Sequence, residues 1–117
     1  MNDLLSLDDA SLVREFRLVA LANIQSIYVD FNTDASIASG LRLEAICTEL
    51  NSRGKDSVVL LKTLLDDPDD NVKSYAVIFV INFDREAALA TLREVKQAGG
   101  FAGFAASIRL DEYEKRR

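Results

Sequence analysis

Apolar residues recur along this chain at the three- and four-residue spacing of amphipathic helices, and turn residues divide them into six segments. The first segment runs from about residue 8 to residue 30, and the second runs from the break at 32–34 to residue 53, where Gly54 supplies a stop. The other four cover about 57–65, 70–83, 84–98 and 101 to the charged end of the chain. The pattern therefore predicts an all-α fold of about six helices.

The stretch from residue 60 to residue 83 predicts a helical hairpin with a tight turn. Pro68 disfavours helical geometry at the residue before it and lacks an amide donor, so a leucine-rich helix ends at about residues 66–68. Asp69, Asp70 and Asn71 then offer side-chain oxygens to the first amides of a new helix.

The second helix of this hairpin is apolar on nearly all sides, which predicts that it is buried between neighbours. A rival interpretation is that residues 75–81 form a buried β-strand, because β-branched and aromatic side chains dominate there. The periods of the surrounding segments favour helix. In the helical interpretation, one face of this segment is formed by Val72, Tyr75, Ala76, Phe79, Val80 and Phe83. The opposite face includes Val77, Ile78 and Ile81.

Several single residues carry further structural expectations. Gly40 lies inside the second helix, where glycine is unfavourable by about 1 kcal/mol against alanine, or where it permits a close helix crossing. Asp56 and Asp84 are expected to cap the third and fifth helices. The glycine-rich run at 99–103 predicts a loop with close helix packing, because no lysine follows at the position that a phosphate-binding loop requires.

Length and composition predict one compact domain over residues 1–117, since 49% of the residues are hydrophobic. The single cysteine, Cys47, excludes an intramolecular disulfide, fits a reducing cytoplasm and is expected to be a small core residue. The acidic start has no basic region and no long apolar run, so no signal peptide is expected. No membrane span is expected either, because the longest apolar run, residues 75–81, is far below the roughly 20 residues required.

The charge balance narrows the possible chemistry. The chain has 14 basic residues, 19 acidic residues and no histidine, which excludes the commonest nucleophile–base pairs and nearly all zinc sites. No metal or cofactor is expected. Duplex nucleic acid is not expected either, because the only basic cluster is the terminal Lys115, Arg116 and Arg117. Acidic pairs that a small carboxylate-dependent enzyme would use are Glu44 with Glu49 and Asp84 with Glu86, although such pairs are typical of solvated helix faces.

Three segments, 49–54, 60–73 and 83–92, together resemble a small bacterial family of HEAT-like helical proteins. That family is catalogued as a domain of unknown function, number twenty-nineteen. Asp67 stands at the turn position of the HEAT pattern, and Val72 and Lys73 stand at the start of its second helix, where arginine is commoner than lysine. The resemblance spans about residues 13–109 and implies a HEAT-like α-α superhelix. It offers no catalytic residue.

These observations favour a non-enzymatic protein-binding module whose acidic face binds a basic protein. An immunity-type inhibitor of a basic toxin or nuclease is one form of this hypothesis. The alternatives are a self-associating structural protein, with Val77, Ile78 and Ile81 as its dimer seam, and the small enzyme described above. The chain itself is expected to be a monomer or a homodimer. The residues expected to bind the partner are Asp66, Asp67, Asp69, Asp70, Lys73, Ser74 and Asn82.

Overall fold

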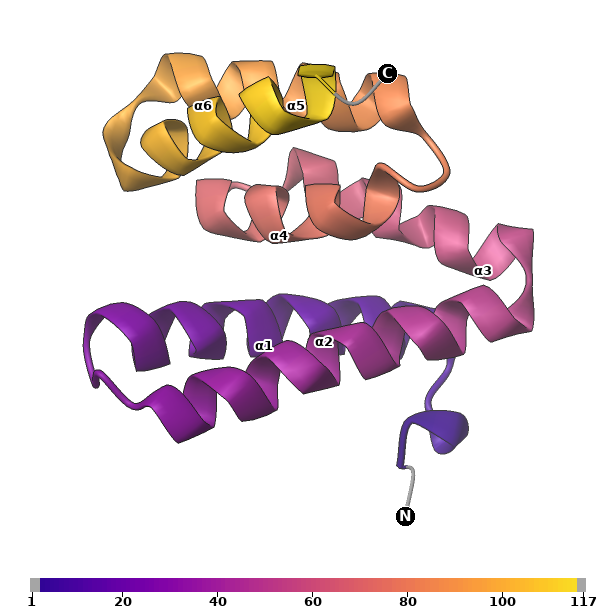
Figure 1. The fold of residues 1–117 in the computed structure, drawn as a ribbon. Coiled ribbons are helices and arrows are strands. Elements are labelled where there is room, and N and C mark those ends of the chain that lie inside the picture. Colours follow the sequence, from indigo (N-terminus) through magenta and orange to yellow (C-terminus); the bar gives the residue numbers. More distant parts are fainter. Residues whose placement is uncertain (1–2, 116–117) are drawn as a thin grey trace. The chain divides into compact units, whose positions relative to one another are not determined.

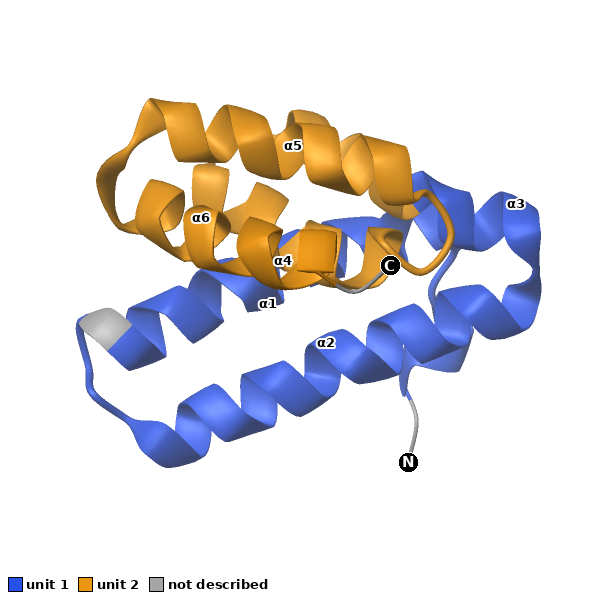
Figure 2. Ribbon diagram, turned by 45° about the horizontal axis from the view of Figure 1, so that its top comes forward, with its two compact units in different colours: residues 1–60 blue, residues 61–117 orange. Residues whose placement is uncertain are grey.

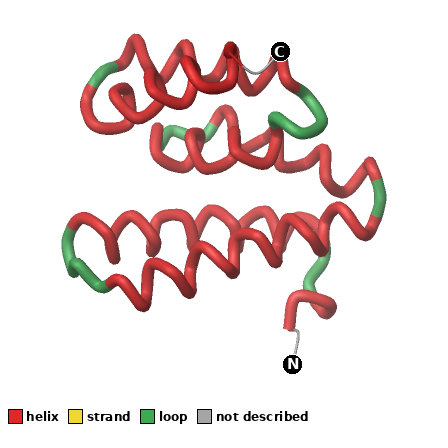
Figure 3. The backbone as a smooth tube through the Cα atoms, viewed as in Figure 1, coloured by secondary structure: helices red, strands yellow, loops and turns green. Residues whose placement is uncertain are grey.

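The computed structural model describes residues 3–115, apart from the side chain of Tyr28, and this part of the chain is helical with no strand (Figures 1 and 3). The all-α prediction is confirmed. The strand interpretation of residues 75–81 is wrong, because a helix covers this stretch as far as Val80. The helices are, in chain order, the 3-10 helix η1 (Asp3–Ser6), α1 (Asp9–Tyr28), α2 (Thr33–Arg53), α3 (Lys55–Val58), the 3-10 helix η2 (Val59–Asp66), α4 (Asp70–Val80), α5 (Arg85–Ala98) and α6 (Gly100–Lys115).

The chain divides into two compact units (Figure 2). Unit 1 comprises residues 1–60 and is built on the hairpin of α1 and α2. Unit 2 comprises residues 61–117 and is built on α4, α5 and α6. The single domain and the superhelical stacking of the hairpins stay predictions.

In unit 1, side-chain caps fix where the two long helices begin. Asp8 accepts a hydrogen bond from the amide of Ser11 at 2.8 Å, and Asn32 accepts one from the amide of Ala35 at 3.0 Å. Each cap satisfies an amide that would otherwise lack a partner at the helix start. The buried apolar residues of this unit are Leu4, Leu12, Phe16, Ala20, Leu43, Ile46, Cys47 and Leu50.

The third helix differs from its prediction. It begins at Lys55 rather than near residue 57, because Gly54 ends α2 at φ 119° and also serves as the N-cap residue of α3. Asp56 therefore lies inside the helix and is not its cap. After Val58 the chain continues as the 3-10 helix η2, which buries Leu61, Leu64 and Leu65 at helical spacing.

In unit 2, two aspartates cap helices as the sequence predicts. Asp69 accepts from the amides of Asn71 and Val72 at 2.8 and 3.3 Å and so begins α4. Asp84 accepts from the amide of Ala87 at 3.1 Å and so begins α5. The buried side of the unit is formed by Val72, Ala76, Val77 and Val80 on α4, Ala88, Thr91, Leu92 and Val95 on α5, and Gly103, Ala106 and Leu110 on α6.

The glycine-rich run at 99–103 was predicted to be a loop with close helix packing, and the loop part is wrong, because α6 begins at Gly100. The close packing is confirmed at Gly103. A Cβ atom on Gly103 would stand 3.0 Å from the carbonyl oxygen of Val95 and 3.2 Å from that of Lys96, so the backbones of α5 and α6 approach each other closely there. Gly40 behaves differently. Nothing lies within 4 Å of the position its Cβ would take, and α2 continues unbroken through it, so the close crossing considered for this glycine does not occur.

Candidate functional site

The aspartates at 66–70 in the predicted binding set mainly make contacts that stabilise the turn before α4. Asp67 is buried, and its Oδ1 accepts from the amide of Asp69 at 2.9 Å, while Asp69 caps α4. Asp70 is half-buried and Asp66 is exposed. Of the four aspartates, Asp66 is therefore the most accessible to a partner.

The three polar residues expected to be exposed on α4 and just after it have different environments. Ser74 is buried, and its hydroxyl donates to the carbonyl of Asp70 at 3.0 Å, so its predicted exposure is wrong. Lys73 is half-buried between Asp70 and Glu94, with N–O distances of 3.7 and 3.9 Å. Asn82 is exposed but lies beyond the end of α4 opposite the acidic turn, so the structure does not gather the set into one surface.

The carboxylates considered for catalysis include two that are engaged in structural contacts. Glu49 pairs with Arg53 at 2.8 Å. Asp84 pairs with Lys62 at 2.5 Å, and hydrogen bonds from Lys62 and from the Ala87 amide lower the pKa of Asp84. Within residues 3–115, no group of three cysteine or acidic side chains is placed to hold a metal ion.

Cys47 is buried in unit 1, as predicted. Burial, with a smaller contribution from the charge of Glu44, raises the pKa of its thiol to about 12. A thiol with so high a pKa is neutral at physiological pH and is a poor nucleophile.

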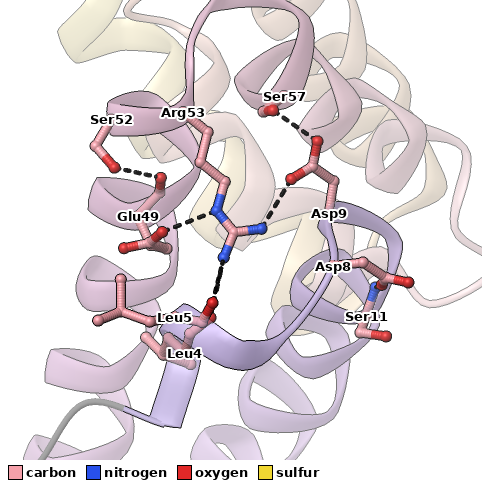
Figure 4. A network of polar contacts seen from close by, with 9 residues as sticks. All are labelled: Leu4, Leu5, Asp8, Asp9, Ser11, Glu49, Ser52, Arg53 and Ser57. Carbon is pink, nitrogen blue, oxygen red and sulfur yellow. Dashed lines mark hydrogen bonds and ion pairs between the residues drawn. The ribbon is translucent and has the colours of Figure 1, made fainter.

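The structure shows a polar network around Arg53 that the sequence analysis missed (Figure 4). The guanidinium donates to Glu49 at 2.8 Å, to Asp9 at 3.0 Å and to the carbonyl oxygen of Leu4 at 3.1 Å. Ser57 donates to the second oxygen of Asp9 at 2.6 Å. The hydrogen bonds from Ser57 and Arg53 lower the pKa of Asp9, and those to Glu49 and Asp9 raise the pKa of Arg53. The network joins η1, α1, α2 and α3 through charged groups and has a structural role.

Arg42 forms a second cluster of the same kind. It donates to both oxygens of Asp3 at 3.1 and 3.0 Å and to Glu15 at 3.1 Å. Unit 1 has nine acidic and five basic residues. Because Arg42 and Arg53 each pair with two of these acids, the acidic excess of the unit remains elsewhere on its surface.

One side of α2 combines that acidic excess with exposed apolar side chains. Ile37 is 57% exposed and Leu41 is 61% exposed, and both occupy the helix face opposite its buried residues. Asp34 and Glu44, which are also exposed, stand one turn before and one turn after them. We call these four residues the α2 strip. A pair of large apolar side chains bracketed by carboxylates can contact a partner that carries apolar and cationic groups together.

Phe31, in the loop before α2, is a further exposed residue that the sequence analysis missed. Its side chain is 80% exposed, and its backbone adopts φ 51°, which is unusual for a bulky residue. Strained residues of this kind are concentrated at functional sites.

An open groove of about 490 Å³ lies between α1 and α2. Leu18 and Ala22 line it from α1, and Ala35 and Ala38 line it from α2, with the Glu15–Arg42 pair also at its wall. Ser39 donates to the carbonyl of Ala35 at 3.0 Å, and Arg42 is held by its acids, so the polar groups of this wall already have partners. The groove offers apolar contact rather than a polar or catalytic constellation.

Comparison with family models, curated proteins and solved structures finds no match to this chain. The resemblance to the HEAT-like family stays a prediction. Among the described helices, none combines the length and the apolar character that crossing a bilayer requires.

Proposed function

We propose that this chain is a non-enzymatic protein-binding module, and that the α2 strip contacts a partner with a basic, partly apolar surface. The observation that carries the proposal is the exposure of Ile37 and Leu41 between Asp34 and Glu44. A few well-packed residues at the centre of a contact carry most of its binding free energy, and flanking charges supply selectivity and a faster association rate.

The charge distribution supports a basic partner. The four arginine-bound acids of unit 1 are Asp3, Glu15, Asp9 and Glu49. Asp30, Asp34, Glu44 and Asp56 are exposed in the same unit. A surface with this excess of negative charge attracts a cationic protein over a distance of about 10 Å at moderate ionic strength.

Phe31 is a second exposed residue of unit 1 that supports a binding role. A phenylalanine that is 80% exposed contributes little to the core, and its left-handed backbone lowers stability relative to glycine. A direct contact between the ring and a partner would explain why an aromatic residue occupies this position.

An immunity-type inhibitor is the specific form of this function that we favour. Toxic nucleases carry basic surfaces for their nucleic-acid substrates, and an acidic helical protein can cover such a surface. The role rests on analogy of charge and size, because many functions share one helical fold.

Affinity capture from a bacterial lysate tests the proposal. The wild-type protein is expected to retain a basic protein at low salt and to release most of it at high salt. The double variant Ile37→Ser/Leu41→Ser is expected to lose that protein at both salt concentrations. Leu18→Ser, which removes an exposed leucine from α1, is the matched control and is expected to retain it. Equal retention by the double variant and the control would assign the partner to another surface.

A second double variant tests the contribution of charge to binding. Asp34→Asn/Glu44→Gln is expected to weaken capture at low salt and to leave little further loss when salt is raised. An unchanged salt response in this variant would contradict the role of these two carboxylates. Protection of cells by the protein against a toxin identified through the capture would then establish the inhibitor role.

A further inference from the structure

The apolar side chains on the outward face of α6 are larger than most of those on its inward face. Phe101, Phe104 and Ile108 are 81%, 69% and 52% exposed, whereas Gly103 and Ala106 are buried on the other side of the helix. These three residues have the spacing i, i+3 and i+7, so they form one continuous stripe together with the exposed Ala105. We call Phe101, Phe104, Ala105 and Ile108 the α6 stripe.

The seam considered from the sequence is not available in the structure. Val77 is fully buried, and Ile78 and Ile81 are half-buried. The exposed apolar surface of unit 2 lies instead mainly on α6. The largest apolar patch on a protein surface, typically a few hundred Å², is often a functional contact.

We propose that the α6 stripe is a two-fold interface between two copies of this chain, with the two α6 helices antiparallel. A two-fold contact requires a surface that is complementary to itself. The stripe meets this requirement about a midpoint between residues 104 and 105. In that register, Phe104 of each copy packs over the small Ala105 of the other, and Phe101 packs beside Ile108.

Charge favours the antiparallel orientation. Asp111 and Glu112 are exposed in the C-terminal half of α6, and the antiparallel register brings them to the start of α6 in the second copy. Amides without helical partners make a helix start electropositive, and the exposed Lys96 lies in the last turn of α5, next to that start. A parallel arrangement would instead place the two acidic ends together.

The area is sufficient for a weak, specific dimer. The exposed fractions of the two phenylalanines and Ile108 correspond to about 400 Å² of apolar surface per copy, taking about 200 Å² for each complete side chain. Two copies contribute about 800 Å², and with a polar rim of about 40% the interface reaches about 1,300 Å². Specific interfaces start at about 1,000 Å², so the dimer is expected to be concentration-dependent.

Light scattering after size exclusion tests the interface. The wild-type protein is expected to approach twice its chain mass of 13.0 kDa at high-micromolar concentration. Phe104→Glu is expected to abolish the dimer and leave the 13.0 kDa species at every concentration. Leu18→Glu, an equally drastic change at an exposed leucine of α1, is the control and is expected to dimerise as the wild type does.

Cysteine cross-linking tests the register independently of stability. Ala105→Cys lies beside the proposed axis, and the buried Cys47 gives little background. Under mild oxidation this variant is expected to form a covalent dimer, whereas the exposed Glu86→Cys on α5 is expected to remain monomeric.

Three results would overturn the interface. They are a wild-type protein that is monomeric at all concentrations, a dimer that Phe104→Glu leaves intact, and equal cross-linking at positions 105 and 86. Monomeric protein that binds phosphatidylglycerol vesicles through Phe104 would assign the stripe to a lipid surface instead. The α2 strip takes no part in these measurements, so either proposal can fail without the other.

Discussion

Arg53 and Asp9 lie 44 positions apart and form an ion pair with an N–O distance of 3.0 Å, which joins the end of α2 to the first turn of α1. The same guanidinium also binds Glu49 and the carbonyl oxygen of Leu4. Its three nitrogens thus fix three different elements of the chain in one planar arrangement, which a single ammonium group cannot reproduce.

Arg53→Lys is therefore expected to lower Tm by several degrees although the positive charge is kept. Lysine retains one ion pair at most and leaves the carbonyl of Leu4 without this donor. Thermal denaturation followed by circular dichroism measures the effect. Arg14→Lys, at an exposed arginine of α1, is the control with an unchanged Tm. A Tm for Arg53→Lys equal to that of the control would refute the structural role of the network.

The same cluster predicts a loss of stability in acid. Hydrogen bonds from Ser57 and Arg53 lower the pKa of Asp9 below its value in the unfolded chain. The unfolded state therefore takes up the proton first, so this contribution is present above about pH 4 and is lost as the pH falls through the lower pKa of the folded state. Asp3, Asp8 and Asp84 act in the same direction, because hydrogen bonds lower the pKa of each.

Urea denaturation at a series of pH values measures this contribution. The wild-type midpoint is expected to fall steeply below about pH 4. Asp9→Asn is expected to start from a lower midpoint at neutral pH and to fall less steeply. Asp30→Asn, at an exposed aspartate of the same unit, should keep the wild-type slope. Parallel curves for the wild type and Asp9→Asn would show that Asp9 is not part of the acid response.

Two helical glycines are expected to respond to alanine in opposite directions. Gly40→Ala meets nothing within 4 Å and should raise the free energy of unfolding by about 0.5–1 kcal/mol, since alanine favours the helix. Gly103→Ala brings a methyl group to 3.0 Å from the Val95 carbonyl oxygen, and it should lower the free energy of unfolding by about 1 kcal/mol. Urea titration of both variants provides the measurement. Stabilisation by both changes would exclude the close approach of α5 and α6.

The sequence predicted the helices well because the features that begin and end them are local. Asp8, Asn32, Asp69 and Asp84 each cap through an amide two or three residues ahead, and Gly54 stops α2 by its own backbone conformation. The start of α3 was missed for a local reason as well. Gly54 ends one helix and begins the next, which leaves no position for the expected cap at Asp56.

The candidate site was predicted less well because exposure depends on neighbours that are distant in sequence. Ser74 is polar, yet the helix face on which it lies is buried, and its carbonyl accepts from Arg109 at 3.2 Å. Conversely, Phe101 and Phe104 are apolar yet exposed. Of the contacts of Arg53, only the pair with Glu49, at spacing i, i+4, could be predicted from the sequence. Its contacts with Asp9 and Leu4 span more than 40 positions. Composition and periodicity do not report such pairings.

Cys47 is expected to be unreactive in the folded protein. Its thiol has a pKa of about 12, so roughly one molecule in ten thousand carries the thiolate at pH 8. The thiol can be followed with a disulfide reagent whose released leaving group absorbs light. The reaction rate of the native protein should be at least two orders of magnitude lower than that of the protein unfolded in urea. Rapid reaction of the native protein, at the rate of an exposed thiol, would show that unit 1 opens around α2.

Replacement of Phe31 is expected to raise the stability of the protein and to weaken its binding to the partner. Phe31→Gly relieves a left-handed backbone that costs about 1 kcal/mol for a residue with a side chain, and the greater freedom of glycine in the unfolded chain cancels part of that gain. Because the ring is largely exposed, little burial is lost, and the free energy of unfolding should rise by about 0.5 kcal/mol. The same variant should retain less of the basic partner in affinity capture, since the proposed contact of the ring is gone. Phe31→Asn, which also tolerates this backbone conformation, should behave alike. A stabilised variant that captures the partner as well as the wild type does would remove Phe31 from the binding surface and leave the α2 strip to carry the interaction alone.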